Sequence, residues 1–69
     1  MKKEKMMADQ LQCMFLEGKL SGFKESYINL ITRKLRTGKV SIIELMQEDP
    51  ILKERIQEAL VRIESEILI

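Results

Sequence analysis

Histidine and tryptophan are absent from the 69 residues, and cysteine occurs once, at position 13. Without histidine, neither a Ser–His nor a Cys–His nucleophile can be assembled. One cysteine cannot form an intrachain disulfide, and with no second soft ligand it cannot make a zinc site. We therefore expect no cofactor, no metal and no enzymatic activity. The lone Cys13 is expected to be a small hydrophobic core residue, and the alternative is a redox-sensing or interchain-disulfide thiol.

Residues that favour β-sheets are also scarce. Valine occurs twice, aromatic residues make up 4% and proline occurs once, whereas isoleucine, leucine and methionine supply most of the apolar content. This composition is typical of helices. It predicts an all-α fold, a small bundle of three main helices plus one short helix in a single domain over residues 1–69. The expected helices cover about residues 4–17, 22–37, 41–47 and 50–67.

Long apolar runs are missing as well. No stretch approaches the ~18–20 apolar residues of a membrane span. The basic start, residues 1–5, is not followed by the apolar segment of a secretory signal. We expect no contact with a membrane and, with a single cysteine, a cytoplasmic location.

Local signals mark several helix ends. Gly38 is expected to end the second helix in the left-handed conformation that glycine tolerates, and Gly18 is expected at or close to the C′ position of the first helix. Ser41 with Glu44 forms a capping-box pattern, and Asp49 before a proline is a second N-cap pattern. Ser21 is a plausible N-cap for the second helix.

The small size of the chain favours association. A domain of this length buries only about 60% of the surface of its unfolded chain. The last helix carries an apolar stripe at 4, 3, 4 spacing, the pattern of a coiled-coil seam. We predict a homodimer in which that stripe is the self-association surface, through Ile56, Leu60, Ile63 and Ile67.

The first helix is rich in methionine, whose flexible side chain suits both variable binding surfaces and ordinary cores. If these methionines form a binding surface, the partner-binding face consists of Met7, Leu11, Met14 and Phe15. The leading functional hypothesis is a small regulatory protein that inhibits or adapts a larger protein by direct contact.

A basic cluster offers a second hypothesis. Arg33, Lys34, Arg36 and Lys39 lie at the end of the second expected helix. They could contact nucleic-acid phosphates, or they could simply be solvated charges that complement the helix dipole. Residues 35–46 resemble the helix–glycine–helix segment of the actinobacterial integration host factor family, which implies DNA binding. The glycine-rich, DNA-contacting turn that follows in that family has no counterpart here.

The charges of the chain are unevenly distributed. Residues 1–39 contain nine basic and four acidic residues, whereas residues 40–69 contain three basic and seven acidic ones. Such a separation orients molecules that approach one another. A third hypothesis is therefore a structural subunit that orders its neighbours in an assembly or scaffold.

Overall fold

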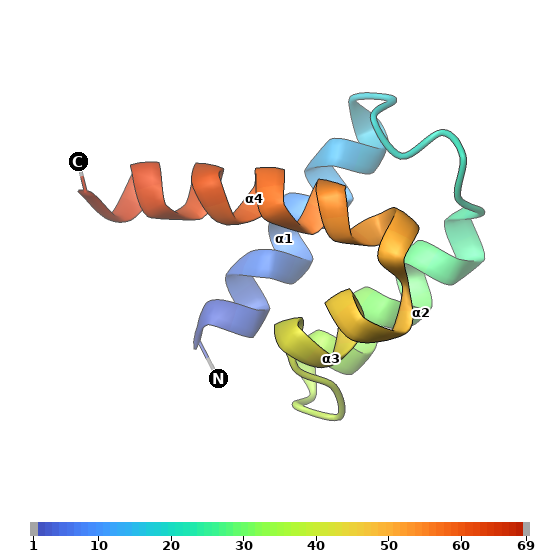
Figure 1. Ribbon diagram of the computed structural model, residues 1–69, viewed down its shortest axis with the longest axis horizontal. Helices are drawn as coiled ribbons and strands as arrows, with labels where there is room; N and C mark the ends of the chain where they lie inside the picture. The colour runs from blue at the N-terminus through green and yellow to red at the C-terminus, as the bar shows by residue number, and fades with distance from the viewer. Residues whose placement is uncertain (1, 69) are drawn as a thin grey trace.

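The computed structural model describes the backbone of residues 2–68 and the side chains of residues 3–65. Within that range it contains four helices and no strand: α1 (Lys2–Leu16), α2 (Glu25–Arg36), α3 (Ile42–Glu48) and α4 (Pro50–Leu68). The prediction of an all-α fold is confirmed. Helix α1 packs against α2 and α4, and α3 packs against α4. In Figure 1, α4 crosses α1 and its C-terminal end extends past the rest of the bundle.

The first two helices end as their glycines predicted. Gly18 has φ of 84° and Gly38 has φ of 75°, both in the left-handed region. After α1, the Lys19 amide donates to the Met14 carbonyl oxygen at 3.0 Å, and after α2 the Lys39 amide donates to the Lys34 carbonyl oxygen at 2.9 Å. These six-to-one hydrogen bonds are those of the Schellman motif, which satisfies carbonyls at a helix end.

Both predicted caps of the second half are also confirmed. The Glu44 amide donates to Ser41 Oγ at 3.1 Å, and the Ser41 amide donates to Glu44 Oε1 at 3.3 Å, which completes the capping box. Asp49 ends α3 and begins α4, because its Oδ1 accepts a hydrogen bond from the Leu52 amide at 3.1 Å. One residue therefore joins the two helices without a linker.

The predicted start of α2 is wrong by three residues. Helix α2 begins at Glu25, and its N-cap is Lys24, which makes no side-chain capping hydrogen bond. Ser21 lies in the preceding turn, where the Phe23 amide donates to the Leu20 carbonyl oxygen at 3.0 Å. Leu20 is fully buried. Its burial holds the connection against the core, so the chain turns once more before the helix can begin.

The core closes within one copy of the chain. Fifteen of the described hydrophobic residues are buried in one cluster that draws on all four helices. The radius of gyration is 11.1 Å, close to the ~11 Å expected for a compact domain of this length. Packing against a second molecule is therefore not needed to bring the apolar faces of the helices together.

Candidate interaction surfaces

The predicted partner-binding face lies inside the molecule. Met7, Leu11 and Met14 have no exposed surface, because α1 is covered by α2 on one side and α4 on another. This prediction was wrong for those three residues, which fill the core. Phe15 is half-buried and packs at the edge of the core.

The predicted self-association stripe of α4 also lies mostly inside the molecule. Ile56 and Ile63 are fully buried in the core, and Leu60 is half-buried against it. The side chain of Ile67 lies outside the described residues. The stripe is therefore mainly an internal packing surface of α4, and the prediction of a seam between copies was wrong for Ile56 and Ile63.

A shallow hollow lies between the end of α1 and the beginning of α2. It has a volume of about 240 Å³ and is lined by Gln12, Phe15, Leu16, Glu25, Ile28 and Asn29. Leu16 is 85% exposed, the highest value among the large hydrophobic residues whose exposure is described. Sequence reasoning missed Leu16 because it falls off the apolar stripe of α1. The sequence feature that could have identified Leu16 is its position, since it is a large apolar residue directly before a helix-ending turn.

The structure separates the four cations of the basic cluster. Arg36 pairs with Asp9 at 2.6 Å and donates to Gln12 Oε1 at 2.8 Å, so its charge is already matched within the chain. Arg33 is exposed and pairs with no described carboxylate. Lys34 and Lys39 line a groove between α2 and α3. The cluster is therefore not one continuous basic patch.

The groove between α2 and α3 has a volume of about 350 Å³. Its apolar side chains come from both helices and the turn between them, and two carboxylates lie on the α3 side. The lining residues are Tyr27, Leu30, Ile31, Lys34, Lys39, Val40, Glu44, Leu45 and Glu48. It therefore combines an apolar floor with charges of both signs.

Tyr27 stands at one end of this groove. Its hydroxyl donates to Asp49 Oδ2 at 2.8 Å, and its ring stacks on Phe23 with centroids 6.0 Å apart. Burial, then the hydrogen bond to Asp49 and the negative charges of Asp49 and Glu48, together raise the pKa of Tyr27 to about 12. The phenol thus links α2 to the α3–α4 junction in its neutral form.

Tyr27 should therefore titrate late. It is the only tyrosine, and tryptophan is absent, so ultraviolet absorbance near 295 nm reports this phenol alone. We expect a midpoint near pH 12 in the folded chain and near pH 10 in urea. Because the folded pKa is raised, the stabilisation is complete below about pH 10 and is lost as the pH rises through 12. Asp49→Asn should lower the midpoint, and a folded-state midpoint near 10 would contradict the hydrogen bond.

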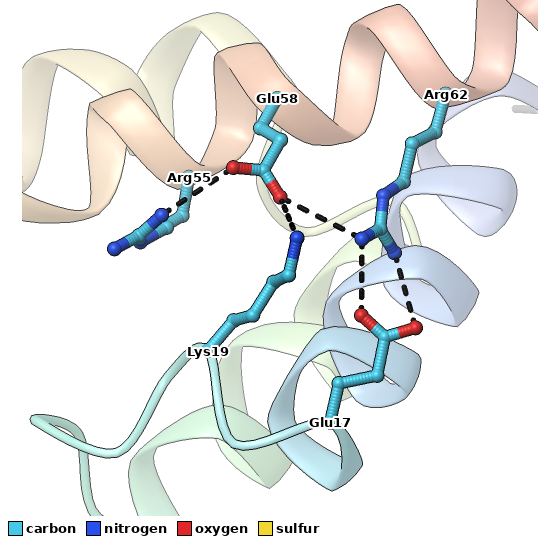
Figure 2. A network of polar contacts seen from close by, with 5 residues as sticks. All are labelled: Glu17, Lys19, Arg55, Glu58 and Arg62. Carbon is cyan, nitrogen blue, oxygen red and sulfur yellow. Dashed lines mark hydrogen bonds and ion pairs between the residues drawn. The ribbon is translucent and has the colours of Figure 1, made fainter.

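A network of exposed ion pairs ties the α1–α2 connection to α4 (Figure 2). Arg62 donates to both oxygens of Glu17, at 3.0 and 3.4 Å, and Lys19 donates to Glu58 at 2.9 Å. The hydrogen bond from Lys19 lowers the pKa of Glu58, and that to Glu17 raises the pKa of Arg62. Exposed pairs of this kind contribute little to the stability of a fold, because solvent and salt screen them. Their role is to position the connection.

Cys13 lies close enough to Arg62 to interact with its charge. It is exposed, so the expectation that it is a core residue was wrong. Residues 7, 11 and 14 form the covered face of α1, and position 13 falls outside it. Among the described residues, no group of three histidine, cysteine or acidic side chains could hold a metal ion. None of the helices, over the part of the chain that is described, has the length and apolar character needed to cross a membrane.

Comparison with known proteins places the chain in a family. The model of the YgzA protein family matches residues 1–63. A protein of Bacillus subtilis (strain 168), named uncharacterized protein YgzA, is 44% identical over 63 residues, which are 91% of this chain and 94% of the relative. No solved structure matches significantly. The matched range contains the whole described core, of which Ile63 is the last residue. The chain belongs to the YgzA protein family.

Proposed function

We propose that this chain is a small interaction protein that regulates a larger protein by binding it at the hollow between α1 and α2. The observation that carries the proposal is Leu16, which is 85% exposed beside that hollow although the core is complete without it. Because its side chain stays in water, Leu16 contributes almost no burial free energy to the fold of this chain. A partner that covers it gains the free energy of burying that apolar surface, about 25 cal/mol per Å².

The surroundings of Leu16 suit a small protein–protein contact. Phe15 and Ile28 supply an apolar floor, and Gln12, Glu25 and Asn29 form a polar rim. An apolar anchor ringed by polar groups is the usual arrangement at the centre of an interface. The hollow is small, so we expect it to accept one or two apolar side chains from an exposed helix or loop.

A homodimer is not required by this proposal. Ile56 and Ile63 are covered within one copy, and of the described residues in the predicted seam only Leu60 keeps part of its side chain outside the core. Leu16, at 85%, is the most exposed of the large hydrophobic residues whose exposure is described. We therefore favour a foreign partner over a second copy.

The test is recovery of a partner with single variants of the exposed surface. The tagged chain, cross-linked in the cells that express it, should recover one protein, and Leu16→Glu or Phe15→Glu should reduce that recovery by about tenfold. Placing a charge at the centre of an interface costs 1.4 kcal/mol or more, which is a tenfold change in affinity. Val61→Glu is the matched control, because Val61 is 63% exposed on another helix. Equal recovery with all variants would refute the proposed surface.

Nucleic-acid binding is the second candidate, and exposed Arg33 is the observation that favours it. Against it, Arg36 is already paired with Asp9, and the other two cations share their groove with carboxylates. Arg33, Lys34 and Arg36 also lie in the last turn of α2, where the helix dipole disfavours anions. Duplex binding that weakens steeply with salt, and loses slope on Arg33→Ala, would favour this candidate instead.

A further inference from the structure

The groove between α2 and α3 is a second surface, distinct from the hollow. Helix α2 lines it with Tyr27, Leu30, Ile31 and Lys34, which follow the i, i+3, i+4, i+7 spacing of one helical face. The hollow uses residues 25, 28 and 29 of the same helix. At 100° per residue these two sets point to opposite sides of α2. A partner in the groove would therefore leave the hollow free.

The charges in the groove are separated along its length. Lys34 and Lys39 lie at the end next to the α2–α3 turn, and Glu48 lies at the other end, where its charge acts on Tyr27. Tyr27 and Lys34 are seven residues apart, which is about 10 Å along the helix. The fourth charged residue, Glu44, is already engaged in the cap of α3. The groove thus has a net positive charge near the α2–α3 turn, where two lysines outnumber Glu44, and a negative charge at the other end.

Three of these groove charges, Lys34, Lys39 and Glu48, have no ion-pair partner among the described residues. Neither lysine forms an ion pair with a described carboxylate, and Glu48 pairs with no described cation. Between the two ends, Leu30 is 47% exposed above buried Ile31 and Leu45. A ligand that covers this apolar floor along its whole length therefore approaches both unpaired ends.

We propose that this groove binds an amphipathic helix of another protein, one with a carboxylate at one end of its apolar stripe and a cation about two turns away. A helix with only acidic flanks would place a carboxylate against Glu48, and one with only basic flanks would place a cation against Lys34 and Lys39. Like charges brought together at an interface are strongly unfavourable. The same argument excludes a polyanion such as nucleic acid and an anionic lipid surface.

With two separate surfaces on α2, the chain can act as an adaptor that holds two partners at once. The inference is independent of the proposed function, because the groove variants described below leave Leu16 and Phe15 unchanged. Recovery of the partner of the hollow should therefore be the same in those variants as in the unmodified chain.

Three labelled helical peptides test the groove. Each has about 12 residues, close to three turns, with the same leucine stripe and a lactam bridge that maintains the helix. One peptide carries Glu at one end and Lys two turns on, one carries Glu at both places and one carries Lys at both. By fluorescence anisotropy, the mixed peptide should bind the unmodified chain about tenfold more tightly than either of the others.

Charge reversals in the protein should then change the preferred peptide. The double variant Lys34→Glu, Lys39→Glu has two acidic ends and should prefer the basic peptide, and Glu48→Lys should prefer the acidic one. Glu44 is left in place because it caps α3. Lys53→Glu is the matched control, since Lys53 is exposed, pairs with no described carboxylate and does not line the groove.

Each outcome decides the proposal. A change of preference that follows the two groove variants but not Lys53→Glu supports it. The same ranking in every variant, or no binding of any peptide, overturns it. The altered residues Lys34, Lys39 and Glu48 are exposed, and circular dichroism of each variant separates loss of binding from loss of fold.

Discussion

Replacing Ile56 by alanine is expected to lower the free energy of unfolding by about 2–4 kcal/mol. Ile56 has no exposed surface and lies in the one core cluster. Truncation removes buried methyl and methylene groups and leaves a cavity that a close-packed core fills only in part. A core of this size rarely supplies more than ~3–5 kcal/mol, so the variant should be largely unfolded near 37 °C. Urea unfolding followed by circular dichroism measures the change.

Ile51→Ala is the control for this result, because Ile51 lies on the same helix and is 78% exposed. Its stability should change by less than about 0.5 kcal/mol. Urea unfolding of the unmodified chain at several protein concentrations tests whether the core is complete in one copy. If the urea midpoint rises with protein concentration, a second copy completes the fold, and the buried stripe of α4 is only part of the stabilising surface.

The parts of the fold that were predictable from the sequence are those with local causes. Gly38 ends α2 because a six-to-one hydrogen bond requires a left-handed residue there, and the Ser41–Glu44 capping box needs only four consecutive residues. Asp49 followed by proline begins α4 for similarly local reasons. These patterns require no knowledge of what packs where.

The errors arose where the outcome depends on tertiary packing. An apolar stripe shows that a helix face is covered, but not by what. The stripe at Met7, Leu11 and Met14 is covered by α2 and α4 of the same chain rather than by a partner. Helix α2 likewise begins at Glu25 rather than near residue 22, because Leu20 is buried in the core. The residues around Leu20 do not reveal this burial.

The two candidate surfaces could not be derived from the sequence for a related reason. Each is made by two helices whose relative placement sets which residues meet. In the sequence, Lys34 belongs to a basic cluster. The α2–α3 turn, which contains Gly38, brings it into the same groove as Glu44 and Glu48. The charge pattern of the groove therefore appears only after folding.

Asp49→Ala is expected to lower the free energy of unfolding by about 2 kcal/mol, the second largest effect among our predictions. The carboxylate has two separate tasks: Oδ1 accepts the Leu52 amide at the start of α4, and Oδ2 accepts the Tyr27 hydroxyl at 2.8 Å. Alanine removes both acceptors at the point where α3 and α4 join without a linker. Thermal unfolding with Tyr27→Phe in a double-mutant cycle separates the two contributions.

Two further variants separate the stabilisation by the N-cap from the stabilisation by the Tyr27 hydrogen bond. Asp49→Asn keeps a side-chain oxygen for the Leu52 amide and should cost less than Asp49→Ala, because asparagine is nearly as good an N-cap as aspartate. Tyr27→Phe leaves the cap intact and removes only the link from α2. If Asp49→Ala costs the same with and without the Tyr27 hydroxyl, that hydrogen bond contributes nothing, and the cap alone stabilises the junction. We expect instead a coupling of about 1 kcal/mol, because the phenol, held neutral by its raised pKa, remains a donor throughout the physiological pH range.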